Sequence, residues 1–240
     1  MHICAQFRLS EDSPISFRPH IEKLYSIVEA LRNTDTYSRE WLLTGSTEKD
    51  AYLYSVFDEN GAMTKAAEAV LETKFKNEKS HRMISIWNGE QEKSKGASIS
   101  YRYTSDSIHS EINIDFPETI EGARKLGDLD AIHHLVNILV QQWAPLAIAI
   151  GPYFYFDKQV FKDRLGVGWM LYLPKILITQ QVPEARALIP VMEGKKQKGT
   201  IIVSVVDEPF DVNNKEHIEI ANAIEIRLVD QDLLPRYADL

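Results

Sequence analysis

The sequence predicts an α+β protein in which one or more mixed, largely antiparallel sheets pack with about four main helices. Helical and strand patterns interleave along the chain without the strict alternation of a parallel βαβ fold. In residues 97–103 and 111–116, hydrophobic and polar side chains alternate, as in antiparallel strands with one face in the core and one in solvent. The hydrophobic fraction of 44% and the charged fraction of 26% are typical of a globular protein.

The first half of the chain is predicted to be rich in strands. Pro19 fits the first turn of a helix, where its missing amide hydrogen is not needed. Hydrophobic residues then follow at helical spacing on one face, namely Ile21, Leu24, Val28 and Leu31. A second helix is expected over residues 64–75, and strands over residues 2–9, 41–44, 52–57, 83–87, 97–103 and 111–116.

In the second half, Asp128 is a suitable N-cap for a helix with one hydrophobic stripe. The stripe consists of Ile132, Leu135, Val136, Leu139 and Trp143. Strands are expected over residues 147–150, 169–173 and 200–206, with a short helix begun by Pro183. Asn213 and Glu216 have the spacing of a capping box before a last helix.

The length of 240 residues suits a single domain spanning residues 1–240. A weak internal similarity suggests two related α/β halves, at about residues 1–120 and 121–240. The pentapeptides SVFDE (residues 55–59) and SVVDE (residues 204–208) each end a hydrophobic strand, and each follows a strand that begins with a tryptophan, Trp41 or Trp169.

Charge and composition limit the partners and the compartment. A net charge of −8 argues against nucleic-acid binding, which requires basic patches. The single cysteine, Cys4, excludes an internal disulfide and fits a reducing compartment. No signal-peptide pattern is seen, and the hydrophobic run over residues 143–156, read as a buried strand that leaves a helix, is too short to span a bilayer. We expect a cytoplasmic protein without a membrane partner.

The segment GVGWMLYLP, residues 166–174, raises the question of a phosphate-binding loop. A dinucleotide loop needs a strand before its glycines and a helix after them. Here a hydrophobic, aromatic strand follows Gly166 and Gly168, and Trp169 stands at its start. We therefore expect no cofactor, and we interpret the glycines as the entry to a strand.

No catalytic or metal site is expected. The acidic pairs Asp58/Glu59 and Asp207/Glu208 stand before Gly or Pro at strand ends, where such residues usually form turns. His133 and His134 follow Asp130 at helical spacing, but no third ligand for a metal is in view.

Trp87, Asn88 and Gly89 end a predicted strand. Asn-Gly is suited to positive φ and turns the chain there. The indole of Trp87 has two open interpretations, packing at the edge of the core or contact with a partner protein.

Negative charge is concentrated at the carboxyl end. Residues 207–240 contain nine acidic and three basic residues, which accounts for −6 of the net charge of −8. A solvated helix face is one interpretation. The other is an acidic docking surface for a basic protein, with Asp207, Glu208, Asp211, Glu216 and Glu219 as candidate partner-binding residues together with Trp87.

Several motifs together resemble the Immunity protein 52 family over about residues 41–235: WLLTGS, ISIWNG, GASISY, GVGWMLYLP and the segment GTIIVSVVDEPFDVNNKEHIEIANAIEIRLVDQDLLP. The resemblance implies a non-enzymatic immunity protein of a bacterial polymorphic-toxin or type VI secretion system. Such a protein binds and silences a cognate toxin, typically a nuclease of the restriction-endonuclease fold.

The glycine-tryptophan pair Gly168 and Trp169 and the Trp87-Asn88-Gly89 motif match the family's patterns, and with Gly166 we interpret them as determinants of the fold. Alternatives are a cytosolic enzyme of unrecognised type and a regulatory protein-binding module. The oligomeric state is left open.

Overall fold

The computed structural model describes residues 1–9, 16–34, 40–77, 81–104, 109–118 and 128–240. Its described strands form one nine-stranded sheet with the order β2-β3-β4-β5-β1-β6-β7-β9-β8, and every pair is antiparallel. The strands are β1 (His2–Phe7), β2 (Leu42–Leu43), β3 (His81–Trp87), β4 (Ser98–Thr104), β5 (Ser110–Asp115), β6 (Ala147–Gly151), β7 (Met170–Leu173), β8 (Ala187–Glu193) and β9 (Lys196–Val203). The predicted α+β class is confirmed.

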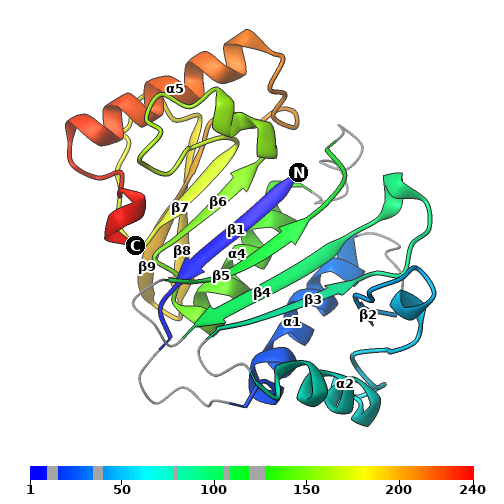
Figure 1. The fold of residues 1–240 in the computed structure, drawn as a ribbon. Helices are drawn as coiled ribbons and strands as arrows, with labels where there is room; N and C mark the ends of the chain where they lie inside the picture. The colour runs from blue at the N-terminus through cyan, green and yellow to red at the C-terminus, as the bar shows by residue number, and fades with distance from the viewer. Residues whose placement is uncertain (10–15, 35–39, 78–80, 105–108, 119–127) are drawn as a thin grey trace.

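The helices lie on both sides of this sheet. They are α1 (Arg18–Thr34), α2 (Lys65–Phe75), α4 (Leu129–Trp143) and α5 (Lys215–Asp230), with short 3-10 turns η1 (Asp50–Tyr52), η2 (Lys93–Lys95), η3 (Tyr153–Asp157) and η4 (Tyr237–Asp239). In Figure 1, α1 and α4 lie behind the sheet, whereas α5 lies in front of it. Helices α1 and α4 pack against each other and form one layer.

Strand register divides the sheet residues into a core face and an outward face. On the core face, one row across the sheet contains Ile84, Tyr101, Ile112, Ala5, Ile148, Tyr172 and Ile201. All seven are buried, and they belong to the larger core cluster with the hydrophobic stripes of α1 and α4. The alternation seen in the sequence therefore continues across neighbouring strands.

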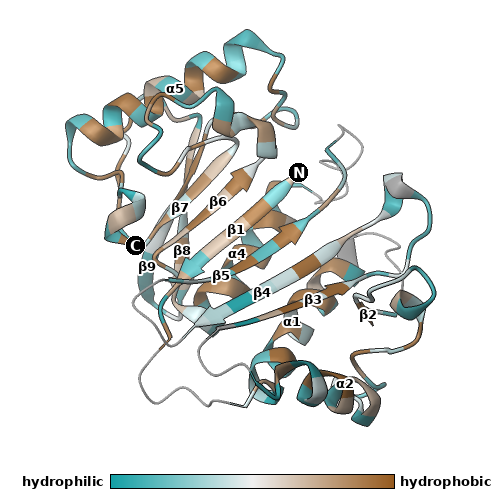
Figure 2. Ribbon diagram, in the orientation of Figure 1, coloured by the Kyte–Doolittle hydropathy of each residue, from teal (hydrophilic) through white to brown (hydrophobic). Residues whose placement is uncertain are grey.

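The outward face is covered over only part of its width. Helix α5 packs Ile224 and Leu228 against Leu171, Leu173 and Ile202 of β7 and β9, and these residues form a second core cluster. Figure 2 shows hydrophobic and hydrophilic residues interspersed along α5, as expected of a helix with one buried side. No described helix packs on the outward side of β1, β5, β4 and β3.

The main predicted helices and their caps are confirmed. Asp128 accepts hydrogen bonds from the amides of Asp130 (3.1 Å) and Ala131 (3.0 Å), and it caps α4 as expected. The residues of the predicted hydrophobic stripes of α1 and α4 are all buried. Thr64, predicted to begin the second helix, is its N-cap.

Two predicted elements are wrong. Residues 52–57 form no strand, because η1 occupies the start of the segment and only isolated bridges at Ser55 and Phe57 follow. Pro183 begins a turn instead of a helix, and β8 follows it. The sequence did not predict β8, since Pro190 disfavours a strand, yet β8 is an edge strand of the sheet, where proline is tolerated.

The strand predicted over residues 147–150 is confirmed, but the end of the hydrophobic run over residues 143–156 differs from its interpretation. Its strand, β6, ends at Gly151, and the aromatic residues that follow form η3 instead of continuing a buried strand. Tyr153, Phe154 and Phe156 are exposed by 67%, 58% and 50%. Strand β9 covers residues 196–203, four residues earlier than expected at its start and three at its end.

The proposed halves remain a hypothesis. The carbonyl of Trp41 accepts a hydrogen bond from the amide of Val56 (2.8 Å), and that of Trp169 accepts one from the amide of Ser204 (3.0 Å). Both pentapeptides thus begin beside the tryptophan that precedes them in the sequence. The junction expected between the halves falls largely on residues 119–127, outside the described part of the chain.

The cap of α5 is one residue later than the sequence suggested. The N-cap is Asn214, whose side-chain oxygen accepts a hydrogen bond from the amide of Glu216 (3.0 Å). The side chain of Asn213 instead donates to Asp211 (3.1 Å).

We therefore expect Asn214→Ala to lower the free energy of unfolding by about 1 kcal/mol, the usual effect of losing an N-cap. Asn213→Ala is the matched control and should have a smaller effect, because its side chain bonds only a neighbouring exposed carboxylate. Urea denaturation of both variants measures the difference. A larger loss for Asn213→Ala would place the cap where the sequence suggested.

Candidate partner-binding surface

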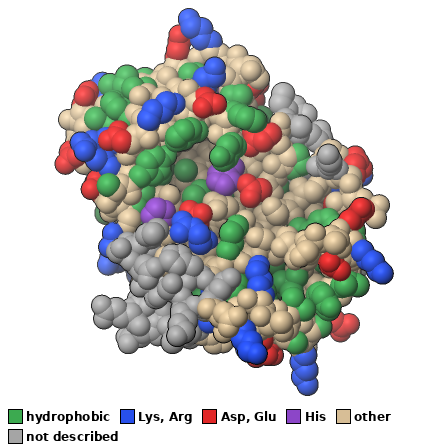
Figure 3. Space-filling view, viewed as in Figure 1, with side chains coloured by type: hydrophobic (Ala, Val, Ile, Leu, Met, Phe, Trp, Pro, Cys, Tyr) green, Lys and Arg blue, Asp and Glu red, His purple; other side chains and the backbone are tan. Residues whose placement is uncertain are grey.

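The uncovered part of the outward face is a polar surface, which we call the open sheet face. It consists of Met83, Ser85 and Trp87 on β3, Ser98, Ser100 and Arg102 on β4, Glu111, Asn113 and Asp115 on β5, and His2, Cys4 and Gln6 on β1. Most of these side chains are half-buried, and Met83 is 51% exposed. Figure 3 views the molecule from this side and shows a hollow below α5 with hydrophobic side chains around it.

The charges on the open sheet face are largely paired. The guanidinium group of Arg102 donates to both carboxylate oxygens of Glu111, at 3.2 and 3.0 Å. Burial alone would raise the pKa of Glu111, but the hydrogen bonds and the charge of Arg102 outweigh it, so this pKa lies below its usual value. His2 contacts Asp115 through Nδ1 at 2.7 Å.

Cys4 is the thiol on this face. Burial, with the nearby charge of Glu111, raises its pKa to about 12. The thiol is therefore protonated at neutral pH, and a protonated thiol is a weak nucleophile. Cys4 is therefore a poor candidate for a catalytic nucleophile.

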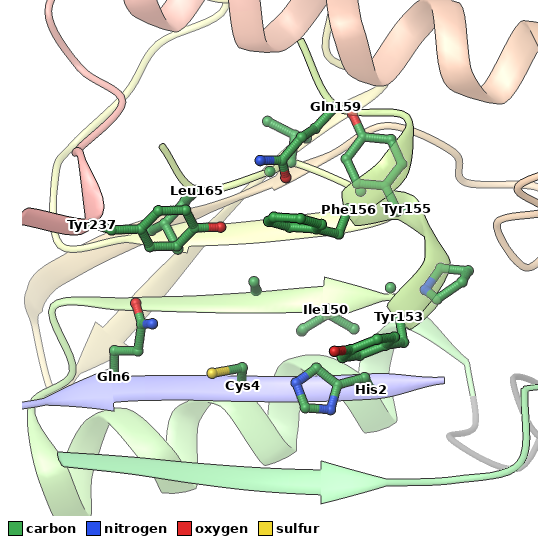
Figure 4. Close-up of a pocket in the computed structure, with 16 residues that line it drawn as sticks. His2, Cys4, Gln6, Ile150, Tyr153, Tyr155, Phe156, Gln159, Leu165 and Tyr237 are labelled. Atoms are coloured by element: carbon green, nitrogen blue, oxygen red, sulfur yellow. The ribbon is translucent and has the colours of Figure 1, made fainter. Parts of the chain in front are cut away.

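A cavity of about 260 Å³ lies where the open sheet face meets the elements below α5. Figure 4 shows its two sides: His2, Cys4 and Gln6 rise from β1, while Tyr155, Phe156, Gln159, Leu165 and Tyr237 lie opposite. Hydrophobic and aromatic groups predominate in its lining. Beside it, Tyr153, Phe154 and Phe156 of η3 form an exposed group that we call the aromatic rim. Large exposed apolar groups close together commonly mark an interaction site.

The glycines of the GVGW segment allow close packing beside the cavity. A Cβ atom on Gly166 would lie 2.6 Å from Oε1 of Gln159 and 3.0 Å from the ring of Tyr155. Gly168 has a φ of +52°, a conformation that glycine adopts without strain. Trp169 is 4% exposed and donates from Nε1 to the carbonyl oxygen of Val205 at 2.9 Å. The GVGW segment therefore packs closely against other segments of the same chain, at Tyr155, Gln159 and Val205.

A buried glutamate on α5 holds the far wall of the cavity. Glu225 is 1% exposed and accepts hydrogen bonds from the hydroxyl of Tyr155 (2.6 Å) and from the amides of Val160 (2.8 Å) and Val167 (3.0 Å). Burial raises its pKa above the usual value, while the hydrogen bonds from Tyr155, Val160 and Val167 oppose this. One carboxylate therefore joins α5, η3, the loop after η3 and the GVGW segment.

The Trp87-Asn88-Gly89 motif shapes the other border of the open sheet face. Trp87 is half-buried, donates from Nε1 to the carbonyl of Ala51 at 3.0 Å, and meets the ring of Tyr52 edge-on. Asn88 is fully buried and bonds both Lys95 and Ala97, each at 2.9 Å, and Gly89 has a φ of +71°. The motif holds the connection between β3 and β4.

The candidate acidic residues lie at the start of α5 and just before it, and they are not adjacent to Trp87. Glu208 contacts His217 at 3.2 Å, Glu219 contacts Lys215 at 3.2 Å, and Glu216 lies 3.9 Å from Arg186. Asp207 and Glu208 border a groove of about 530 Å³ with Asp128 and Asp130. Asp211 accepts from the backbone and side chain of Asn213.

Trp87 and these acids are widely separated along the sheet. The order of strands places six spacings between β3 and β9, about 29 Å at the usual interstrand distance. The structure therefore brings the acids together with one another and leaves Trp87 on a different part of the surface.

The remaining candidate groups have structural surroundings. Asp58 accepts the amides of Asn60 and Ala62 at 2.9 Å each, which makes it a turn former. Nε2 of His133 is buried without a hydrogen-bond partner, and His134 is exposed. Within the described residues, no group of three or more His, Cys, Asp or Glu side chains is arranged to hold a metal ion.

Sequence reasoning missed Glu225, Gln6 and the aromatic rim. Glu225 stood within an acidic segment and looked like its exposed neighbours. The four aromatic residues 153–156 were a usable signal, because an aromatic run after Gly151-Pro152 cannot continue β6 unbroken.

An α+β fold with a partly uncovered sheet face and an exposed aromatic rim is suited to binding a partner protein. Comparison with known families agrees. The sequence model of the Immunity protein 52 family matches residues 19–236 of the chain, so the chain belongs to this family. It is therefore an immunity protein, which implies binding to a cognate toxin and indicates a non-enzymatic role.

Other comparisons add little. No curated protein matches the chain. In the part of the chain that the structure describes, no helix combines the length and hydrophobicity needed to cross a membrane.

Trp169→Ala should lower the free energy of unfolding by roughly 3–5 kcal/mol, because it removes a large buried aromatic side chain. Trp87→Ala is the matched control and should cost less, since Trp87 is only half-buried. Chemical denaturation followed by circular dichroism checks both. A stable, folded Trp169→Ala protein that no longer binds its toxin would assign Trp169 to the interface instead.

Glu225→Gln should destabilise the protein by about 1–3 kcal/mol, because an amide nitrogen would face a buried backbone amide donor. The raised pKa sets the dependence on pH. The stability associated with this carboxyl group is fully present below its unfolded pKa, near 4.5, and is lost as the pH rises through the folded pKa.

The difference between wild type and Glu225→Gln should therefore shrink as the pH rises from 4.5. Urea denaturation at several pH values between 4.5 and 7.5 measures it. Glu219→Gln, on the exposed side of the same helix, should change stability by less than about 0.5 kcal/mol at every pH. A difference that grows with pH would contradict the raised pKa.

Proposed function

We propose that this immunity protein neutralises a secreted DNase of the restriction-endonuclease fold, delivered by a type VI secretion system or a related polymorphic-toxin system. By binding the toxin in the cytoplasm, it protects the cell that produces both. Membership of the Immunity protein 52 family supports the binding role. The class of toxin and the delivery system rest on the properties that the resemblance implies.

The observation that carries the proposal is the open sheet face with the aromatic rim beside it. The four strands of this face span about 19 Å by roughly 20 Å, or about 400 Å². A stable interface needs about 800 Å² from each partner. The sheet face alone is therefore too small, and we propose that the interface extends over the aromatic rim beside it.

The acidic residues near the amino end of α5 contribute charge. A DNase needs a basic surface, since neutralising phosphates drives its affinity for DNA. Carboxylates offered to that surface compete with phosphates and speed the encounter of the two proteins. Glu216 and Glu219 are exposed, and their contacts with Arg186 and Lys215 are solvent-exposed ion pairs. Such pairs are weak, so the carboxylates are available to a partner.

The direct experiment is to express the protein together with the toxin encoded beside it and to purify a tagged copy. A stoichiometric complex and a loss of DNase activity on binding are the expected results. A toxin that remains free and active at micromolar concentrations of both proteins would contradict the proposal.

The charge contribution is tested by a triple variant, Asp211→Lys, Glu216→Lys and Glu219→Lys. Rim charges act mainly on association, so binding should be slower and less dependent on salt, while stability should change little. The matched control reverses Glu29, Glu48 and Glu72, exposed residues away from α5, with the same change in net charge. Stopped-flow association rates across salt concentrations distinguish the two. Equal rates for the two variants would mean that the acids near α5 are only a solvated helix face.

A further inference from the structure

The volume of the cavity, about 260 Å³, can be compared with the volumes of known ligand sites. Sites for cofactors and drug-sized ligands usually measure about 300–1,000 Å³. A buried apolar cavity of about 150 Å³ holds a benzene molecule. The cavity lies near the lower end of that range and is large enough for a ring system bigger than benzene.

Two polar side chains of the described lining, Tyr155 and Gln159, already donate hydrogen bonds within the protein. The hydroxyl of Tyr155 donates to Glu225, and the side-chain nitrogen of Gln159 donates to the carbonyl of Phe161 at 2.7 Å. Gln6 is 7% exposed, and its Oε1 is buried without a hydrogen-bond partner. Figure 4 shows this side chain rising from β1 toward Tyr237.

An unpaired buried acceptor costs about 1–3 kcal/mol, so an occupant that supplies a donor there is favoured. Gln6 lies at one end of the lining (Figure 4). A complementary occupant would therefore be mostly apolar, with one hydrogen-bond donor at its tip.

The charge of the lining selects against a cationic occupant. Among the described residues that line the cavity, none is Lys, Arg, Asp or Glu. The carboxylate of Glu225 lies behind the wall and is already bonded to three donors. Burying a lysine or arginine side chain without a partner charge is costly. The walls are instead aromatic and aliphatic, from Phe156, Tyr237 and Leu165.

We propose that this cavity receives one tryptophan or tyrosine side chain of the toxin, whose N–H or O–H donates to Oε1 of Gln6. The inference rests on the proposed function and adds to it the anchoring contact. Large aromatic side chains buried in pockets at the centre of an interface supply a large share of binding energy. The aromatic rim lies on one side of the entrance, where the ring of Tyr153 meets His2 edge-on.

The first experiment tests the cavity without the toxin. Indole is the probe, and indene, which has the same shape without the N–H donor, is its control. Both are titrated into the isotope-labelled protein, and amide shifts of Cys4, Gly151 and Gly168 are followed by NMR. We expect indole to bind at least fivefold more tightly than indene. Gln6→Met, which keeps the volume and removes the acceptor, should abolish that difference.

The second experiment uses the toxin. Ala149 lines the cavity, and Ala149→Phe should fill it, abolish indole binding and weaken toxin binding at least tenfold. Ala66→Phe, on the exposed side of α2, is the matched control and should change neither. Gln6→Met alone should weaken toxin binding several-fold without changing the folded state.

Three results would overturn the inference. They are the absence of indole binding at millimolar concentration, tighter binding of ethylguanidinium than of indole, and unchanged toxin affinity in both Gln6→Met and Ala149→Phe. If the wild-type protein binds indole as expected but not the toxin, the proposed function fails while the cavity's preference stands. If it binds the toxin but not indole, the function stands and the anchoring contact fails.

Discussion

Successive side chains of a strand point to opposite faces of the sheet, so a nine-stranded sheet needs cover on both. In the described part of the chain, α1 and α4 cover one face, whereas α5 covers only part of the other. The side chains of the outward face differ between its covered and uncovered parts. Where α5 packs, outward residues such as Leu171 and Ile202 are apolar. Where it does not, their equivalents along the same row are Cys4, Asn113, Ser100 and Ser85.

The cavity lies where the part of the outward face covered by α5 meets the uncovered part. It requires glycines at 166 and 168, because side chains there would meet Tyr155 or need a strained backbone. It also requires a buried carboxylate, since the loop around it has amides that no strand satisfies. The GVGW segment, whose glycines resemble those of a phosphate loop in the sequence, thus allows close packing at the edge of the proposed binding surface. The acids near the start of α5 are a separate feature, suited to guiding the approach of a basic partner.

The fold class, the main helices and most strands could be predicted because each is encoded locally, by alternation, helical stripes and caps such as Asp128. The failures have physical causes. Pro190 is compatible with a strand only at an edge, and strand order is not visible in a linear pattern. Glu225 and Gln6 have nothing local to mark them, because their importance comes from contacts across the fold. Gln6 lines the cavity only once β1 has folded together with residues near positions 155, 166 and 237, which are distant in the sequence.

The carboxylate of Glu225 also sets the order in which the binding surface matures during synthesis. The floor of the cavity is made by β1 and β6, whereas its opposite wall depends on a hydrogen bond from Tyr155 to a residue 70 positions later. At a translation rate of about 5–20 residues per second, α5 leaves the ribosome roughly 4–14 seconds after η3. Strands β7, β8 and β9 are synthesised during that interval, so the sheet and the cavity are both unfinished until its later part. The far wall of the cavity is therefore completed only when the last helix docks, near the end of synthesis.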